Sequence, residues 1–283
     1  MSGHERRAHG HAEQGRIDAE GVFIRLGQGA EAFEAVQDVS FTVPAGEFVC
    51  VLGPSGCGKS TLLGALAGHI APAHGALTLD GAAISGPHPD RGIVFQHHTL
   101  FPWKNVRDNI AFGPKMRGIP KAERHRQADE ILELIGLGGF AGRYPKQLSG
   151  GMQQRVEIAR VLVNHPRLLL MDEPFGALDA LTRMMMQELL LDIWTRLRTT
   201  IVFITHDIDE ALFLADRVLV MSPRPGRIVE DITVPFERPR RAEIVAEPPF
   251  GRLKRHCLDL LRPRPGTDTL PRLSPLGAPP HAR

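Results

Sequence analysis

The stretch of sequence that decides the fold is Gly53-Pro54-Ser55-Gly56-Cys57-Gly58-Lys59-Ser60-Thr61. An apolar run at residues 48–52 precedes it and leucines at helical spacing follow it, so the local order is strand, loop, helix. Glycines leave the backbone N–H groups of such a loop open to a phosphate chain, and the positive end of the following helix faces the same place. This combination predicts a binding site for a nucleoside triphosphate.

Two side chains of this loop suit particular parts of a triphosphate. Lys59 can reach the β- and γ-phosphates, and the hydroxyl of Ser60 is placed to ligate Mg²⁺. The alternative is a glycine-rich turn that binds nothing. The strand and the helix on either side of the loop argue against that alternative.

Length and composition are those of an ordinary globular protein. The 283 residues suffice for one large domain or two small ones, and the net charge of +2 indicates no nucleic-acid partner. No window approaches the roughly 18 to 20 apolar residues of a membrane span, and the charged, His-rich start does not resemble a secretory signal. The cysteines Cys50, Cys57 and Cys257 fit a reducing compartment without disulfides. These features predict a cytoplasmic protein.

Polar side chains close two further apolar runs, where ligands collect at the carboxyl edge of a parallel sheet. Gln96 closes the first run, and Asp172 and Glu173 close the second. Asp172 can hold Mg²⁺ through water or Ser60, and Glu173 can accept a proton from an attacking water. A surface acidic pair is the alternative, but such a pair would follow a polar segment.

Two more segments fit the same chemistry. His206 ends the apolar run at residues 200–205 and is expected at the same sheet edge as Lys59, although a lone histidine there is more often structural. Residues 148–155 place a serine and two glycines before a helix, which makes a second helix start able to receive an anion. A plain helix cap is an equally good interpretation of that segment alone.

Composition along the chain predicts its organisation. We expect a disordered lead at residues 1–20 and a folded domain that carries these motifs at 21–235, with a helical subdomain at about 97–160. Alternating apolar residues near the start predict a small antiparallel sheet beside the parallel core. The extension at 236–283 should carry one helix near 250–261 and be flexible after residue 262.

Taken in order, these elements resemble the ATP-binding subunit of ABC transporters over about residues 22–232. The resemblance implies an α/β P-loop NTPase fold with a mostly parallel central sheet, an antiparallel β subdomain and an inserted helical subdomain, using ATP and Mg²⁺. It identifies the motifs as the Walker A loop at 53–61, the Q-loop residue Gln96 (also a metal ligand), the signature at 148–153, the Walker B pair Asp172 and Glu173, the D-loop residue Asp179 and the switch histidine His206.

The resemblance also implies partners. In this family two copies pack head to tail, so that the signature of one closes over the ATP held by the other. The residues expected to contact the partner's nucleotide are Ser149, Gly150, Gly151, Gln153 and Asp179. Further implied partners are integral membrane permease subunits and, indirectly, a periplasmic or extracellular solute-binding protein. The expected location is the cytoplasmic face of the inner membrane, as a peripheral subunit.

The sequence between the motifs is similar to that of one importer group. The sequence DEPFGALDALTR at 172–183 and SPRPGRI at 222–228 resemble the taurine, sulfonate and nitrate importers, and residues 186–194 are most similar to taurine importers. Nitrate, another small anion or an organic solute is the alternative cargo. A soluble, non-transport ABC ATPase is the alternative of a different class. Such proteins usually carry two cassettes or a long coiled-coil insertion, and this chain has neither.

The resemblance leaves two roles open, that of the residue that stacks on adenine and that of the segment at residues 100–103. Leu26 stands where the family usually stacks adenine on an aromatic ring, and Phe33 or Phe23 could substitute for it. Residues 100–103 (LFPW) are expected near the surface that docks on a permease. Ordinary packing of Trp103 inside the helical subdomain is the alternative.

Overall fold

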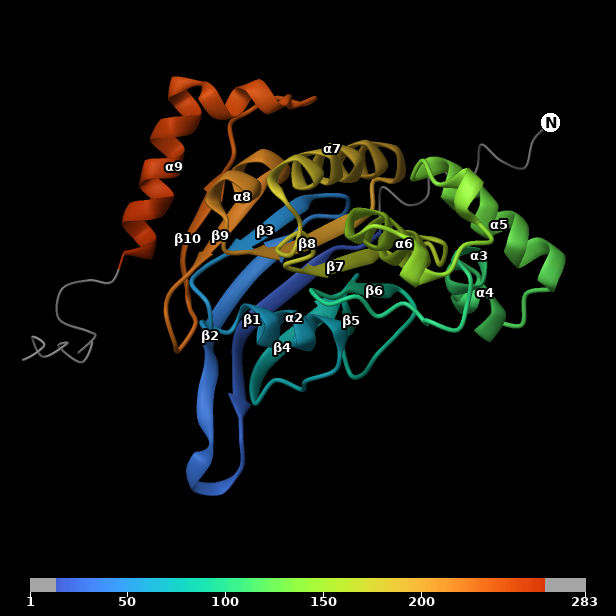
Figure 1. The fold of residues 1–283 in the computed structure, drawn as a ribbon. Helices are drawn as coiled ribbons and strands as arrows, with labels where there is room; N and C mark the ends of the chain where they lie inside the picture. Colours follow the sequence, from blue (N-terminus) through green and yellow to red (C-terminus); the bar gives the residue numbers. More distant parts are fainter. Residues whose placement is uncertain (1–13, 263–283) are drawn as a thin grey trace, which may run out of the picture.

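Two sheets lie on either side of the helix α2 (Lys59–Ala67) in the computed structural model, which describes residues 14–262 (Figure 1). The larger sheet has six strands in the spatial order β10 (Ile228–Thr233), β9 (Arg217–Met221), β3 (Phe48–Leu52), β8 (Thr200–Thr205), β7 (Leu168–Asp172) and β6 (Arg91–Val94). The strand β10 pairs antiparallel with β9, and the other pairs of this sheet are parallel.

The smaller sheet is antiparallel throughout. Its order is β2 (Phe33–Val43), β1 (Ile17–Leu26), β4 (His74–Leu79) and β5 (Ala82–Ala83). The predicted α/β fold, with a mostly parallel sheet and an antiparallel sheet beside it, is therefore confirmed.

The predicted end of the lead at residue 20 is wrong, because β1 begins at Ile17. Ile17, Ala19 and Val22 are buried in the antiparallel sheet. Gly21, with φ +53°, lies at a register shift between Ala19 and Val22, and this irregularity hid the alternation in the sequence. The lead before residue 14, with its three histidines, and the tail after residue 262 lie outside the described residues.

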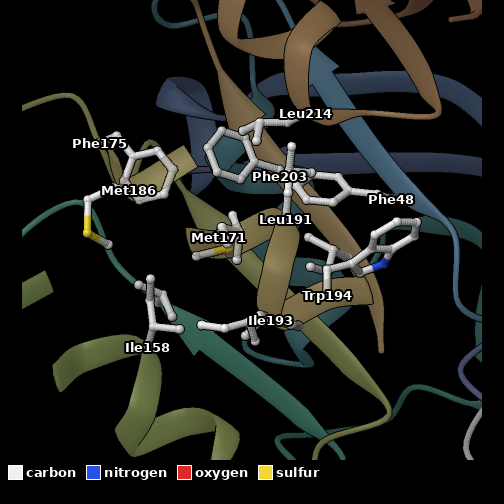
Figure 2. Close-up of a cluster of buried hydrophobic side chains, with 14 of the residues drawn as sticks. Phe48, Ile158, Met171, Phe175, Met186, Leu191, Ile193, Trp194, Phe203 and Leu214 are labelled. Atoms are coloured by element: carbon white, nitrogen blue, oxygen red, sulfur yellow. The ribbon is translucent and has the colours of Figure 1, made fainter. Parts of the chain in front are cut away.

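Successive residues of the central strands pack into two different cores. Phe48, Cys50 and Leu52 of β3 face a core shared with the helices at residues 150–162, 180–197, 208–214 and 248–261. Val49 and Val51 face α2 and the smaller sheet. This arrangement explains why these strands are almost continuously apolar, because a strand covered on both faces exposes neither to water. Figure 2 shows the helix-side core, where Phe203 and Phe175 lie beside Met171. The three cysteines are free and buried.

The helices after Gln96 form the inserted helical part, grouped to one side of the larger sheet (Figure 1). They are α3 (Val106–Ile110), α4 (Phe112–Met116) and α5 (Lys121–Leu134), followed by α6 (Gly150–Leu162). The remaining helices are α7 (Ala180–Leu197), α8 (Ile208–Leu214) and α9 (Pro248–Leu261), with short 3-10 turns η1 (Gly29–Glu31), η2 (Gly138–Phe140), η3 (Pro145–Gln147) and η4 (Ala242–Ala246). Within residues 14–262, none of the helices is long and apolar enough to span a bilayer.

The chain after β10 turns back over α8. Arg240 is 7% exposed and donates hydrogen bonds to three carbonyl oxygens at the end of α8, those of Leu212, Phe213 and Ala215. A cation at the carboxyl end of a helix satisfies carbonyls that have no partner within the helix. The amphipathic helix α9 then buries Phe250 against the same region.

Candidate functional site

The site lies at the carboxyl edge of the larger sheet, where neighbouring parallel strands end side by side. The strand β3 leads into the glycine loop, β7 ends at Asp172, and β8 is followed by His206. A cavity of about 320 Å³ opens there. It is lined by Leu26, Ala35, Ser55, Gly56, Gly58, Lys59, Ser60, Thr61, Gln96, Glu173 and Arg224.

The glycine loop wraps the first turn of α2. Gly58 precedes the helix with φ +105°, and a Cβ atom there would come within 2.6 Å of the Ala35 carbonyl oxygen, so only glycine fits. The Nζ atom of Lys59 donates to the carbonyl oxygens of Gly53 (2.8 Å) and Pro54 (3.0 Å). These bonds hold the ammonium group between the loop and the sheet edge, and the whole Lys59 side chain is 5% exposed.

Three members of the predicted loop do not line the cavity: Gly53, Pro54 and Cys57. Cys57 packs into the core below the loop, and burial raises the pKa of its thiol. Its role is therefore packing, and the thiol is neither exposed nor acidic enough to act as a nucleophile.

Ser60 and Asp172 meet at the first turn of α2. The Ser60 hydroxyl donates to Oδ1 of Asp172 at 3.0 Å. Burial raises the pKa of Asp172 above its ordinary value, and the hydrogen bond from Ser60 offsets only part of this rise. Mg²⁺ prefers such hard oxygen ligands, and it would neutralise a partly desolvated carboxylate, so this pair fits a magnesium ion.

Glu173 lies between the side chains of Lys59 and His206. Its Oε1 atom lies 3.8 Å from Nζ of Lys59, and its Oε2 atom lies 2.9 Å from Nδ1 of His206. The backbone at Glu173 has φ +43°, in the left-handed region that few residues other than glycine adopt, while its N–H donates to the Ile204 carbonyl oxygen at 3.0 Å. Such a conformation at a carboxylate facing a cavity is typical of a functional site.

The signature residues and Asp179 do not join this group. Ser149 caps α6 by accepting a hydrogen bond from the Met152 N–H, and Asp179 caps α7 by accepting one from the Thr182 N–H. The hydrogen bond from Thr182 lowers the pKa of Asp179. Ser149, Gly150, Gly151, Gln153 and Asp179 lie outside the cavity lining. Asp172 and His206 do not line the cavity either, but each forms a hydrogen bond with a lining residue, Ser60 and Glu173 respectively.

The two caps are nevertheless close to each other. A Cβ atom at Gly151 would come within 2.6 Å of the Thr182 side chain, so the starts of α6 and α7 pack together. The side-chain amide of Gln153 donates to the carbonyl oxygens of Pro145 (3.1 Å) and Leu148 (3.2 Å), which fixes the turn before α6.

Two lining residues, Ala35 and Arg224, were not predicted from the sequence. Arg224 belongs to the basic turn after β9, and the sequence of this turn was used only for its similarity to one importer group. The available signal was topological: β9 is parallel to β3, so its carboxyl end reaches the same edge as the glycine loop.

Comparison with known proteins decides the family. The model of the family described as ABC transporter matches residues 36–176. The taurine import ATP-binding protein TauB of Rhizobium johnstonii is 50% identical over 252 residues, covering 87% of this chain and 95% of that protein. This chain belongs to the ABC transporter ATP-binding proteins.

A second curated relative and two solved structures are also similar to this chain. The nitrate import ATP-binding protein NrtD of a Synechocystis species is 48% identical over 241 residues, covering 83% of this chain and 91% of that protein. A dimeric bacterial ABC transporter cassette is 31% identical with a TM-score of 0.69, covering 78% of this chain and all (100%) of that one. A dimeric cassette in a post-hydrolysis state bound to ADP and Pi has 30% identity, a TM-score of 0.68 and the same coverage of 78% and 100%. Like its family, this chain is an ATPase.

Proposed function

We propose that this chain is the ATP-hydrolysing subunit of an importer that takes up taurine or a related sulfonate through a separate membrane permease. One observation carries the proposal: Lys59, Ser60, Asp172, Glu173 and His206 converge at one sheet edge in an ABC ATPase. The name of the relative at 50% identity supports taurine as cargo. Nitrate, another small anion or an organic solute is the alternative, supported by the relative at 48% identity.

The geometry supports a division of labour within the site. The loop amides and Lys59 bind the phosphates, while Ser60 and Asp172 would hold Mg²⁺. Gln96, which follows β6 at the same sheet edge, would be a further ligand. When bound, Mg²⁺ neutralises charge that develops on the phosphate oxygens. Glu173 accepts the proton of the attacking water. We assign His206 to orienting Glu173 and sensing the γ-phosphate.

A head-to-tail dimer of two copies is part of the proposal. The five signature and D-loop residues lie outside the cavity of their own chain, although α6 and α7 present them together. A second copy would bring Ser149, Gly150 and Gly151 over the ATP of the first. The two similar cassettes solved as dimers support this arrangement.

The segment at residues 99–103, which we call the docking segment, is our candidate for the permease contact. Trp103 is 71% exposed, which disfavours the alternative that it is ordinary packing. Beneath it, Phe101 packs edge-on against Phe112, with ring centroids 4.7 Å apart. An exposed indole on a fixed base is typical of a contact with another protein.

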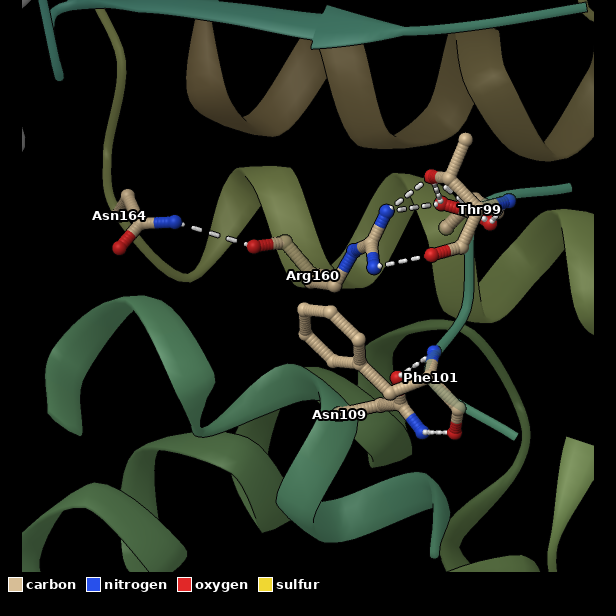
Figure 3. Close-up of polar contacts among 6 residues, drawn as sticks. Thr99, Phe101, Asn109, Arg160 and Asn164 are labelled. Carbon is tan, nitrogen blue, oxygen red and sulfur yellow. Dashed lines mark hydrogen bonds and ion pairs between the residues drawn. The ribbon is translucent and has the colours of Figure 1, made fainter. Parts of the chain in front are cut away.

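The docking segment is fixed to two helices, as Figure 3 shows. Asn109 of α3 accepts a hydrogen bond from the Phe101 N–H at 2.8 Å and donates to the Phe101 carbonyl oxygen at 3.1 Å. Arg160 of α6 donates to the Thr99 carbonyl oxygen at 2.9 Å, with its guanidinium 5.5 Å from the Phe101 ring centroid. Because α6 begins with the signature, a displacement of the docking segment would be transmitted toward the partner's ATP.

The proposed place of the protein is peripheral, on the cytoplasmic face of the inner membrane, with a periplasmic or extracellular solute-binding protein acting on the permease from the other side. No nucleic acid takes part. A soluble ABC ATPase without a transport role is the alternative of a different class. The exposed Trp103 favours a membrane partner, because the alternative gives that surface no purpose.

Uptake measured in cells tests the proposal. Cells lacking this chain should lose uptake of radiolabelled taurine, and regain it with the wild-type chain. Trp103→Ala should abolish rescue and leave ATP hydrolysis by the purified protein within about twofold of wild type. Phe140→Ala, another exposed aromatic of the helical part, is the matched control and should rescue fully. Undiminished taurine uptake without this chain would refute the cargo, and full rescue by Trp103→Ala would refute the docking segment.

A further inference from the structure

The lining of the cavity forms two groups of contacts. In the first group, at the strand ends, Lys59 contacts Glu173 and Ser60 contacts Asp172. Arg224 belongs to the other group, which lies beside the paired ends of β1 and β2. The γ-phosphate and the base stand at opposite ends of ATP, so a nucleotide whose γ-phosphate is held by the first group extends its base toward the second.

The turn that carries Arg224 is fastened in place. The Gly226 N–H donates to the Ala35 carbonyl oxygen at 3.0 Å, and the Gln37 N–H donates to the Gly226 carbonyl oxygen at 2.9 Å. A Cβ atom at Gly226 would come within 2.2 Å of the Cys57 carbonyl oxygen, so the turn packs directly on the glycine loop. These contacts join the turn to β2 and to the phosphate-binding loop, which fixes Arg224 at the cavity.

The guanidinium of Arg224 rests on an aromatic ring. Its Cζ atom lies 4.6 Å from the centroid of Phe33, and its Nε donates to the Gly56 carbonyl oxygen at 3.3 Å. No acidic side chain among residues 14–262 forms an ion pair with it. Its side chain is exposed and lines the cavity, whereas Phe33 is not part of the lining.

We propose that Arg224, supported by Phe33, is the surface on which the purine base of ATP stacks in this chain. A guanidinium plane stacks on flat π-systems, and a neighbouring ring on its other face keeps it oriented. Leu26, which pairs with Phe33 across β1 and β2, is too small to offer such a plane and packs beside it. The inference rests on the proposed function, in which Lys59 and the glycine loop bind the phosphates of ATP, and it names the residues that hold the base.

The other aromatic candidate is engaged elsewhere. Phe23 packs edge-on against His74, with ring centroids 6.0 Å apart, and it does not line the cavity. It therefore serves as a control residue. Arg25, an exposed cation of β1 that also lies outside the lining, is the control for removal of one positive charge.

Equilibrium dialysis with two ligands tests the inference. One ligand is the non-hydrolysable ATP analogue AMP-PNP with Mg²⁺, and the other is inorganic tripolyphosphate with Mg²⁺, which has no base. Arg224→Ala should raise the dissociation constant for AMP-PNP roughly 5- to 100-fold and change that for tripolyphosphate less than about twofold. Arg224→Lys, which keeps the charge but loses the plane, and Phe33→Leu should share the defect in part. Phe23→Leu and Arg25→Ala should bind both ligands as wild type does.

Each other result has a definite meaning. An equal loss for both ligands in Arg224→Ala would show a phosphate contact and overturn the stacking role. Unchanged AMP-PNP binding in Arg224→Ala would overturn it as well. Failure of the wild-type chain to bind either ligand would instead overturn the proposed function, so the two failures are distinguishable.

Discussion

The Nδ1 atom of His206 lies 2.9 Å from the Oε2 atom of Glu173. The contact follows from strand register, because Asp172 of β7 pairs with Ile204 of β8. Glu173 and His206, which follow the ends of these strands, therefore lie at the same sheet edge. Lys59 approaches the other carboxylate oxygen of Glu173 at 3.8 Å. The proposed general base is thus oriented from both sides by side chains of its own chain.

Substitution of His206 tests this orientation. We expect His206→Ala to lower kcat on the order of 100-fold, because a misplaced catalytic group costs about that much. His206→Gln, which can still donate a hydrogen bond to Glu173, should retain more activity than His206→Ala. Steady-state hydrolysis of ATP measures both. The histidine is 56% exposed, so the unfolding temperature should not change, and a variant as active as wild type would show that the contact has no catalytic role.

Asp172 should make magnesium binding sensitive to pH. Burial raises the pKa of this carboxyl, and Mg²⁺ binds the ionised form, so the affinity for Mg²⁺ should fall at a higher pH than an ordinary aspartate would cause. Titration of Mg²⁺ into the nucleotide complex at several pH values measures this effect. Asp172→Asn should bind Mg²⁺ weakly at every pH. An unchanged magnesium affinity in Asp172→Asn would remove Asp172 from the metal site.

The same raised pKa has a consequence for stability. The folded protein holds the Asp172 proton more tightly than the unfolded chain does, so this carboxyl stabilises the metal-free fold below its unfolded pKa. That contribution is lost as pH rises through the folded pKa. Near neutral pH, Asp172→Asn should therefore unfold at the same or a higher temperature than wild type without Mg²⁺. A clear drop in the unfolding temperature would contradict this expectation.

Arg240 should be the main tie between the C-terminal extension and α8. Arg240→Ala removes the donor to three carbonyl oxygens, and buried acceptors left without partners cost about 1–3 kcal/mol in the free energy of unfolding. Urea denaturation measures the loss. Arg241→Ala, an exposed neighbour, is the control and should change the free energy of unfolding by less than about 0.5 kcal/mol. Equal stability of the two variants would show that the tie is unimportant.

Much of the site was predictable because parallel strands end at a common edge. An apolar run that closes on a polar residue, as at Asp172, Glu173 and His206, therefore places that residue near the glycine loop without knowledge of the strand order. The antiparallel sheet was predictable from alternation, but its first strand was not fully so. Gly21 shifts the register of β1 and conceals the buried Ile17.

The remaining features depend on contacts between distant segments. Arg224 reaches the cavity because Gly226 packs on the carbonyl oxygen of Cys57, and no spacing in the sequence encodes that approach. The segment at 148–155 reads equally well as a plain cap, and Ser149 is a cap in this chain. Its proposed second role requires another copy, and contacts between copies leave no period in a single sequence.

The most direct test of the central proposal is Mg²⁺-dependent ATP hydrolysis measured against protein concentration, for wild type and for Glu173→Gln. We expect the specific activity of wild type to rise with concentration, because each site needs the signature of a second copy. Glu173→Gln should bind ATP, form a dimer in its presence and hydrolyse it at least about 100-fold more slowly. Activity that is independent of concentration would contradict the dimer, and an active Glu173→Gln variant would contradict the assignment of the base.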